Sequence, residues 1–375
     1  MQVEQSRWTL SKGWVDVQSN LATTADAQLV FLFLDPDCLM NKAAISELQS
    51  RYPNACIVGG SSAGNVYGAE VNDDDMVATA VYFEKSEIQV KYLVADNDHL
   101  VTQAAEVATS MKRDDLQHLL VLSDGLTVNG SELAKGVNVL EDVSITGGLM
   151  GDKGRFNETF IMVDGVAHKN SVVFVGFYGN ELDVRYGCFA GWDEFGVDRV
   201  ITKSKGNVVY EIDGQPALEL YKSYLGDFSQ ELPISGLRFP LSIRVSNEQM
   251  LIRTLLAVDE EEQSLTFAGD VPEGSMTLLM KGNTESLIEG ARKAATQAKG
   301  GRNTGFAIVI SCVGRRLLMG QMVEEELDVV QEELGENTIV SGFYSYGELA
   351  PYSDQFYQSE LHNQTMTLLA VYENE

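Results

Sequence analysis

Basic residues are scarce in this chain of 375 residues. Only 27 Lys and Arg accompany 55 Asp and Glu, which gives a formal net charge of −28. The densest basic groups are pairs such as Lys112-Arg113, whereas nucleic acids and anionic membranes are both bound through a basic face. We therefore expect neither nucleic acid nor a membrane surface as a partner, and we attribute the acidity to a soluble, mutually repelling surface.

Cysteine and histidine are also rare, with four residues of each. The cysteines form no CxxC pair, whereas zinc and iron–sulfur sites usually show short paired spacings, so the sequence argues against both. Cys56, Cys188 and Cys312 lie in apolar, strand-like runs and are expected to be small core residues. The four positions are Cys38, Cys56, Cys188 and Cys312.

Long hydrophobic runs are missing as well. The longest, such as residues 29–34, fall far short of the ~20 residues that a membrane helix needs, and the N-terminal residues lack the basic-then-apolar order of a signal peptide. We therefore expect a cytoplasmic protein.

What the chain does contain is a repeat. Residues 27–84, 117–179 and 304–373 each read as an apolar strand, a helix of about ten residues, a second strand that leads into a glycine-containing pair, and a third strand. Short β-branched runs that alternate with helical patterns are typical of α/β proteins with a largely buried sheet. We expect α/β strand–helix–strand–strand units with the last strand antiparallel, and therefore mixed sheets.

The stretch from about residue 193 to 280 does not follow the repeat. It contains strand-like runs, a short helix at 216–224 and a Pro-Glu-Gly turn. We therefore divide the chain into two halves, residues 1–225 and residues 226–375.

Two sequence signals could belong to catalysis. Residues 60–64, Gly-Ser-Ser-Ala-Gly, match the G-x-S-x-G pattern of a nucleophile elbow, but the elbow needs a helix directly after the serine and a polar turn follows here. A hydrolase that uses Ser62 or Cys312 is therefore the least favoured class. We favour a structural interpretation of the glycine pairs over a catalytic one: they allow a positive φ or a close backbone approach, either for packing or for a ligand.

The four histidines form no HxH, HxxxH or HExxH pattern, so a multi-histidine metal site would have to be assembled across the fold. A haem needs only one axial histidine and an apolar pocket. His362 precedes the last strand and lies near several aromatic residues in sequence. On residue type alone, a hydrogen-bonded histidine at the start of a strand is the preferred interpretation.

The C-terminal motifs resemble a known family. Residues 312–315 (Cys-Val-Gly-Arg), 342–348 (Gly-Phe-Tyr-Ser-Tyr-Gly-Glu) and 362–368 (His-Asn-Gln-Thr-Met-Thr-Leu) are similar to the C-terminal signature of FIST-domain proteins. The glycine turns at 59–64 and 146–148 and the Ser-Asp-Gly at 123–125 support the resemblance. It extends over nearly the whole chain, with an N-terminal FIST part to about residue 225 and a C-terminal part beyond it.

The resemblance implies a sensory module for a small ligand and no enzyme. A stand-alone chain of this kind resembles the nitric-oxide-sensing haemoproteins of the family, which implies haem b, nitric oxide as the signal, and a separate sensor histidine kinase as the partner; a homodimer is a further expectation. His362 would be the axial ligand of the iron. The other residues assigned to the cofactor are Gly342, Tyr344, Tyr346, Arg315 and Arg316, and Arg238 is a further candidate for the haem propionates.

A second interpretation needs no haem. A general metabolite sensor, for amino acids as an example, would use the glycine turns with Arg315 or Glu348 to hold carboxylate and ammonium groups. A Soret band separates the two interpretations, since only the haemoprotein is coloured.

Overall fold

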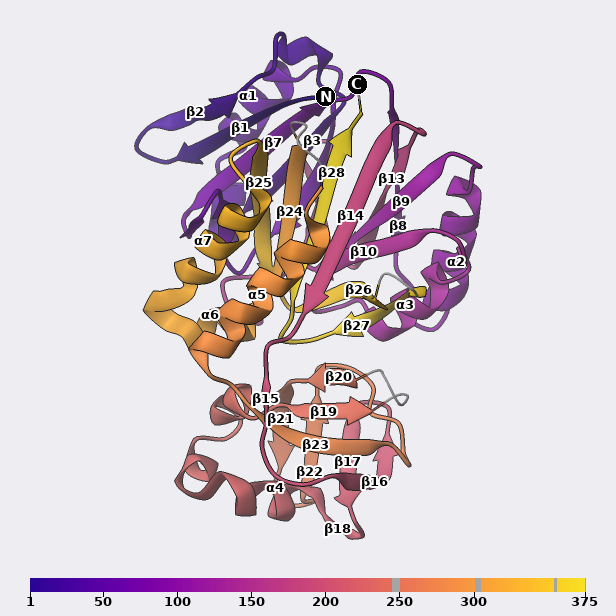
Figure 1. Ribbon diagram of the computed structural model, residues 1–375, viewed down its shortest axis with the longest axis vertical. Helices are drawn as coiled ribbons and strands as arrows, with labels where there is room; N and C mark the ends of the chain where they lie inside the picture. The colour runs from indigo at the N-terminus through magenta and orange to yellow at the C-terminus, as the bar shows by residue number, and fades with distance from the viewer. Residues whose placement is uncertain (245–249, 301–304, 354–355, 375) are drawn as a thin grey trace.

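The computed structural model describes residues 1–244, 250–300, 305–353 and 356–374 and contains three units of the same topology (Figure 1). The first unit is β3 (Leu29–Leu34), α1 (Lys42–Arg51), β4 (Cys56–Ser61) and β7 (Asp75–Tyr82). The second is β9 (Leu116–Ser123), α3 (Gly130–Val137), β10 (Ser144–Leu149) and β13 (Ser171–Tyr178). The third is β24 (Gly305–Cys312), α7 (Val323–Leu334), β25 (Thr338–Ser345) and β28 (Met366–Glu373).

The three units share their strand order as well as their sequence order. In each sheet the first strand is central, the second lies parallel on one side and the third antiparallel on the other: β4-β3-β7, β10-β9-β13 and β25-β24-β28. The predicted repeat, the α/β class and the mixed sheets are therefore confirmed.

One further strand precedes each unit and pairs antiparallel with its third strand. These strands are β1 (Gln2–Thr9), β8 (Glu87–Val94) and β14 (Leu182–Phe189). Helices α2 (Leu100–Met111) and α5 (Thr284–Ala298) precede the second and third units, and β2 (Gly13–Ser19) extends the first sheet beyond β1.

The hairpin that follows each second strand pairs with a different unit. The hairpin β5 (Asn65–Tyr67)–β6 (Glu70–Asn72) joins β25, the hairpin β11 (Ile161–Val163)–β12 (Val166–His168) joins β4, and β26 (Gly347–Ser353)–β27 (Phe356–His362) joins β10. Each unit thus donates one hairpin and receives one, which links the three sheets in a closed cycle.

The glycine pairs lie inside strands, where they allow the close approach of two backbones. A Cβ on Gly59, Gly147 or Gly342 would stand 2.0, 1.9 or 2.0 Å from a carbonyl oxygen of the neighbouring strand. The predicted turns at these positions are therefore wrong, because β4, β10 and β25 continue through the glycines. The prediction of a close backbone approach is confirmed.

Aromatic side chains from different units meet in the core between the sheets. The Phe33 ring centroid lies 4.8 Å from that of Phe343, and Phe31 lies 5.8 Å from Phe306. All four are fully buried. Since these rings come from the first and third units, burial of their surface stabilises the packing of these two units against each other.

Residues 193–281 form a second, smaller lobe below the three units (Figure 1). Two connections join it to the upper lobe, from β14 into β15 and from β23 into α5. The predicted division at residue 225 falls inside this lobe, at the end of α4, and stays a prediction. The strands and helix of the lobe are β15 (Asp193–Glu194), β16 (Arg199–Lys205), β17 (Val208–Ile212), β18 (Gln215–Pro216), α4 (Ala217–Leu225), β19 (Leu241–Arg244), β20 (Met250–Arg253), β21 (Leu255–Asp259), β22 (Ser264–Phe267) and β23 (Met276–Lys281).

The remaining elements are short. Helix α6 (Val313–Met319) follows β24, and the 3-10 turns are η1 (Thr24–Asp26), η2 (Pro36–Met40), η3 (Gly226–Glu231), η4 (Ile234–Arg238) and η5 (Gly320–Met322). Across the described residues we find no helix of the length and apolarity that a bilayer crossing requires.

Candidate functional site

The carboxyl end of the central strand occupies an equivalent place in each unit. The glycines above pair with Leu32, Val121 and Val309, so Asp35, Asp124 and Cys312 follow at equivalent positions. In sheets that contain parallel strands, ligands bind in the crevice outside these carboxyl ends.

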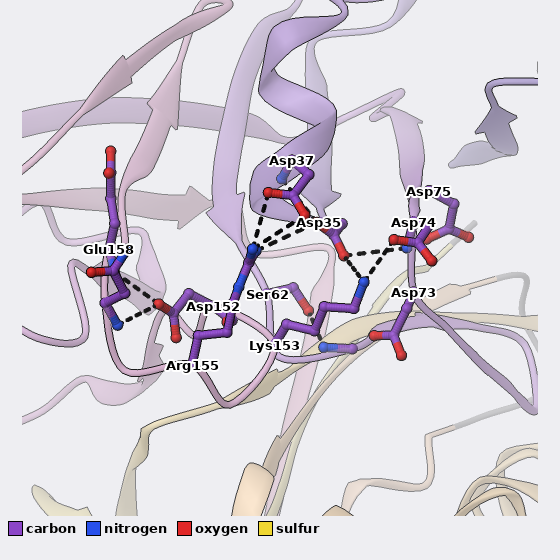
Figure 2. A network of polar contacts seen from close by, with 12 residues as sticks. Asp35, Asp37, Ser62, Asp73, Asp74, Asp75, Asp152, Lys153, Arg155 and Glu158 are labelled. Atoms are coloured by element: carbon purple, nitrogen blue, oxygen red, sulfur yellow. Dashed lines mark hydrogen bonds and ion pairs between the residues drawn. The ribbon is translucent and has the colours of Figure 1, made fainter.

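Charged side chains fill the end of the first unit (Figure 2). Lys153 reaches in from the loop after β10, with Nζ 3.0 Å from Asp35 and 2.6 Å from Asp74, and Arg155 lies 3.0 Å from Asp37. Burial alone would raise the pKa of Asp35, but hydrogen bonds from the Asp37 N–H and from Lys153 outweigh it and hold that pKa below its usual range. These paired charges close the first end.

The smaller lobe covers the end of the third unit. The Cys312 N–H donates to the Thr365 carbonyl, and the Gln364 side chain donates to the Leu237 carbonyl of the smaller lobe at 3.3 Å. Burial raises the pKa of the Cys312 thiol above its usual range. The thiol is therefore a protonated core group, and the third end is closed as well.

The end of the second unit opens into a cavity of about 430 Å³ between the two lobes. Its upper wall includes Gly125, Asn129 and Tyr346, and its lower wall includes Asn207 and Phe267. This volume falls within the ~300–1,000 Å³ that small-ligand sites occupy.

Hydrogen bonds to buried polar groups hold the upper wall in place. The Asp124 carboxylate, 1% exposed, accepts the Leu126 and Thr127 N–H groups at 3.0 and 3.2 Å. Asn129 caps α3 by accepting from the Ser131 N–H at 3.0 Å. The positive end of the α3 dipole therefore faces the region of the cavity.

An aromatic pair forms another part of the wall. The Phe156 and Tyr346 rings stack with centroids 4.4 Å apart and planes 12° apart, and Phe156 is 51% exposed. Phe156 also has a φ of +52°, a conformation that a bulky residue adopts only when its surroundings impose it.

Asp152 imposes that conformation. Its buried carboxylate accepts the N–H groups of Phe156, Asn157 and Glu158 at 2.8, 2.6 and 2.8 Å, and the Tyr346 hydroxyl donates to it. Burial, together with this hydrogen bond, raises the pKa of Tyr346 above its usual range. The same loop carries Lys153 and Arg155, so the charged network in Figure 2 anchors the loop that presents Phe156.

Among the described residues of the smaller lobe, one ionisable side chain lines the cavity. Asp270 lies 3.5 Å from Lys135 of α3, which joins the two walls. The exposed Leu126 and Leu256 face the same cavity from opposite lobes. The site therefore combines apolar surface, an aromatic pair, one carboxylate and a helix N-terminus.

Of the predicted site residues, Tyr346 lines this cavity. Arg315 and Tyr344 are fully buried and converge on Glu326, which lies 2.8 Å from Arg315 Nη2 and accepts from the Tyr344 hydroxyl at 2.7 Å. Burial raises the pKa of Tyr344 well above its usual range. This cluster is an internal ion pair with satisfied hydrogen bonds.

Arg316, Gly342 and Arg238 lie in three different places. Arg316 makes a bidentate contact with Asp73 at 3.0 and 2.8 Å. Gly342 is buried within β25, and Arg238 is exposed, 5.9 Å from the Phe228 ring centroid. Arg316 also lies 5.7 Å from the Tyr344 ring centroid, so the structure brings Arg315, Arg316 and Tyr344 together, whereas Tyr346 and His362 are not part of this cluster.

His362 lies at the end of β27 and is 5% exposed. Its Nε2 donates to the Ala350 carbonyl at 3.0 Å across the β26–β27 hairpin, and burial lowers its pKa to about 4. The residue lines neither this cavity nor the second one described below. His362 is therefore a hydrogen-bonded residue of this hairpin, and the haem assignment stays a prediction.

Ser62, the residue of the G-x-S-x-G motif, is 2% exposed. Its Oγ accepts from the Gly64 N–H at 2.9 Å, which makes the motif a backbone turn. No helix follows it: β5 begins at Asn65.

Sequence reasoning missed Phe156, Asn129 and Asp270. A helix-start signal was available for one of them, because Asn129 is followed three residues later by Glu132, as in a capping box. Nothing local marks Phe156 or Asp270, since their role depends on partners far away in the chain.

Comparisons with known proteins identify the family of the chain. A model of the FIST N domain matches residues 28–215, and a model of the FIST C domain matches residues 217–351. An uncharacterized protein of Methanocaldococcus jannaschii is 24% identical over 374 residues, which covers 89% of this chain and 71% of that protein.

Solved structures of cyanuric acid hydrolases are more distant. The enzyme from A. caulinodans aligns over 100% of both chains with 10% identity and a TM-score of 0.39. Another cyanuric acid hydrolase aligns over 99% of both chains with 10% identity and a TM-score of 0.32. At these values the likeness says nothing about activity. The two domain models together span residues 28–351, and the chain belongs to the FIST-domain family, whose domains sense small ligands.

Proposed function

We propose that this small-ligand sensor binds its ligand in the cavity between the lobes, at the end of the second unit. The observation that carries the proposal is the contrast between the three equivalent strand ends: charged pairs fill the first, the smaller lobe covers the third, and the second opens into about 430 Å³. A ligand in this cavity would contact both lobes, so its binding energy could bias their arrangement.

The lining favours a small metabolite with an apolar body and opposite charges at its polar end. Phe156, Leu126 and Leu256 supply apolar surface, Asp270 can pair with an ammonium group, and the N-terminus of α3 favours a carboxylate. An amino acid has these features and is the first class to test. Arg315 and Glu348, which the sequence suggested for these roles, are both fully buried and are replaced in the proposal by residues of the cavity.

The test is isothermal calorimetry with the twenty common amino acids. We expect one chemical group of them to bind, and Phe156→Ala to weaken that binding about tenfold through lost stacking and burial. Leu317→Ala is the matched control, because Leu317 is 55% exposed on α6. Equal affinity in wild type and Phe156→Ala would place the ligand elsewhere, and no binding by any amino acid would refute this ligand class.

We further propose that the protein binds without turnover and that a separate protein reads out its state. Haem-based nitric oxide sensing with a histidine kinase partner remains the alternative and rests on the family resemblance. It predicts a Soret band after reconstitution with haem, lost in His362→Ala but kept in His99→Ala. It also predicts that nitric oxide changes the autophosphorylation of the kinase. A reconstituted protein without a Soret band would refute it.

A further inference from the structure

A second cavity, of about 520 Å³, lies beside the two connections between the lobes. Residues 190–192, which connect β14 to β15, line one side, and the first turns of α5 line another. Gly290 allows α5 to come this close, because a Cβ on Gly290 would lie 2.9 Å from the Gly191 Cα, and a Cβ on Gly191 would in turn lie 2.3 Å from the Ser286 carbonyl oxygen. The cavity is separate from the proposed ligand site, and its lining residues are different.

The inner surface of this cavity is apolar. Ile252 and Met280 are 6% and 4% exposed, and Trp192 and Met250 complete the surface. Methionine side chains adapt to the shape of what they contact, and a tryptophan ring attracts cations. This surface suits the alkyl part of a ligand.

The rim of the cavity is acidic. Glu285, Glu289 and Lys293 follow one another at four-residue spacing on one face of α5, and Asp193 lies beside the N-terminus of this helix. Among the described residues that line the cavity, three carboxylates and one ammonium group leave a net charge of −2, and this local charge favours a cation over an anion.

The carboxylates differ in how they are already engaged. Asp193 accepts from the Asn283 amide at 2.7 Å and from the Ser286 hydroxyl at 2.9 Å. Glu289 lies 4.0 Å from Arg292, a contact at the limit of an ion pair. Within the part of the chain that the structure describes, Glu285 has no hydrogen-bond or ion-pair partner. Glu285 and Glu289 are therefore available to a bound ammonium group.

We propose that this cavity binds a small aliphatic ammonium compound, with its alkyl chain on Trp192 and Met280 and its charged end at Glu285 and Glu289. The volume matches small-ligand sites. A purely apolar ligand would leave the carboxylates unused, and an anion would be repelled by them. Lys293 lowers the affinity, because its ammonium group lies on the same rim, 5.3 Å from the Phe189 ring centroid.

The probe is hexamethylenediamine, and hexanediol is the matched neutral compound of the same length. Calorimetry at low ionic strength should show binding of the diamine and at least tenfold weaker binding of the diol, since an ion pair and its hydrogen bonds are lost. Equal affinities for the two compounds would overturn the proposal, because charge would then play no role.

Variants separate a defined site from general attraction to an acidic chain. Glu285→Gln with Glu289→Gln should weaken diamine binding at least tenfold, and Lys293→Met should strengthen it about threefold. The control is Glu261→Gln with Glu262→Gln, which removes the same charge from an exposed turn of the smaller lobe and should leave affinity unchanged. The site would be refuted if the control bound the diamine as weakly as the Glu285→Gln, Glu289→Gln variant does. It would also be refuted if that variant bound the diamine as tightly as wild type. All five substituted positions are exposed, and circular dichroism checks that the variants fold.

Discussion

Glu348 is a fully buried carboxyl group whose titration should be visible in the stability of the protein. It accepts from the Thr365 N–H at 3.2 Å and from the Thr365 hydroxyl at 2.9 Å, and it is hydrogen-bonded to Ser345. Burial raises its pKa from 4.5 to about 7, although these hydrogen bonds and the charge of Arg315 oppose the rise. The folded protein therefore holds this proton more tightly than the unfolded chain.

The sign and the size of the effect follow from linkage. A carboxyl group with a raised pKa in the folded state contributes stability that is fully present below pH 4.5 and is lost as the pH rises to about 7. One pKa unit corresponds to about 1.4 kcal/mol, so this group alone removes about 3 kcal/mol across the window. The buried His118 and His362 have lowered pKa values, and their titration acts in the opposite direction, so wild type alone is not diagnostic.

The comparison that isolates Glu348 is Glu348→Gln, which keeps the shape of the side chain and has no titrating proton. We expect the free energy of unfolding of the variant, relative to wild type, to rise by about 3 kcal/mol between pH 4.5 and 7 and to level off above it. Urea unfolding followed by tryptophan fluorescence measures both proteins, with the exposed Glu325→Gln as the control. A difference that does not change with pH would refute the reasoning.

Three further substitutions, one of them a control, test the buried ion pair and the close backbone contact. Glu326→Gln leaves the buried Arg315 without its charge partner and should destabilise the protein by about 3–5 kcal/mol in urea unfolding. A loss below about 1 kcal/mol would mean that the backbone carbonyls around Arg315 stabilise its buried charge without Glu326. Gly147→Ala places a Cβ 1.9 Å from the Val121 carbonyl oxygen and should lower the free energy of unfolding by about 3 kcal/mol or more. The Cβ of the control Gly154→Ala meets no atom within 4 Å, and this substitution should lower the free energy of unfolding by about 1 kcal/mol. Similar losses in the two glycine variants would contradict the backbone-contact argument.

The pattern of elements was readable from the sequence because it is local. Each strand–helix–strand–strand unit is indicated by apolar runs and helical spacing within about sixty residues, so the α/β class and the three copies could be predicted. The close backbone approach at the glycines could be predicted from residue type, since few other residues tolerate it. The motifs at residues 312–315 and 342–348 were enough to point to the family.

The site was decided by the tertiary structure alone. The sequence does not say that each hairpin pairs with another unit, and that exchange brings Tyr346 of the third unit against Phe156 of the second. Nor does it say which strand end stays open: Lys153 closes the first, and Asp270 of the smaller lobe lines the second. Arginine, tyrosine and histidine look alike in sequence whether they face a ligand or a buried partner. Here Arg315 and His362 face buried partners, because satisfying an interior polar group requires a match across the whole fold.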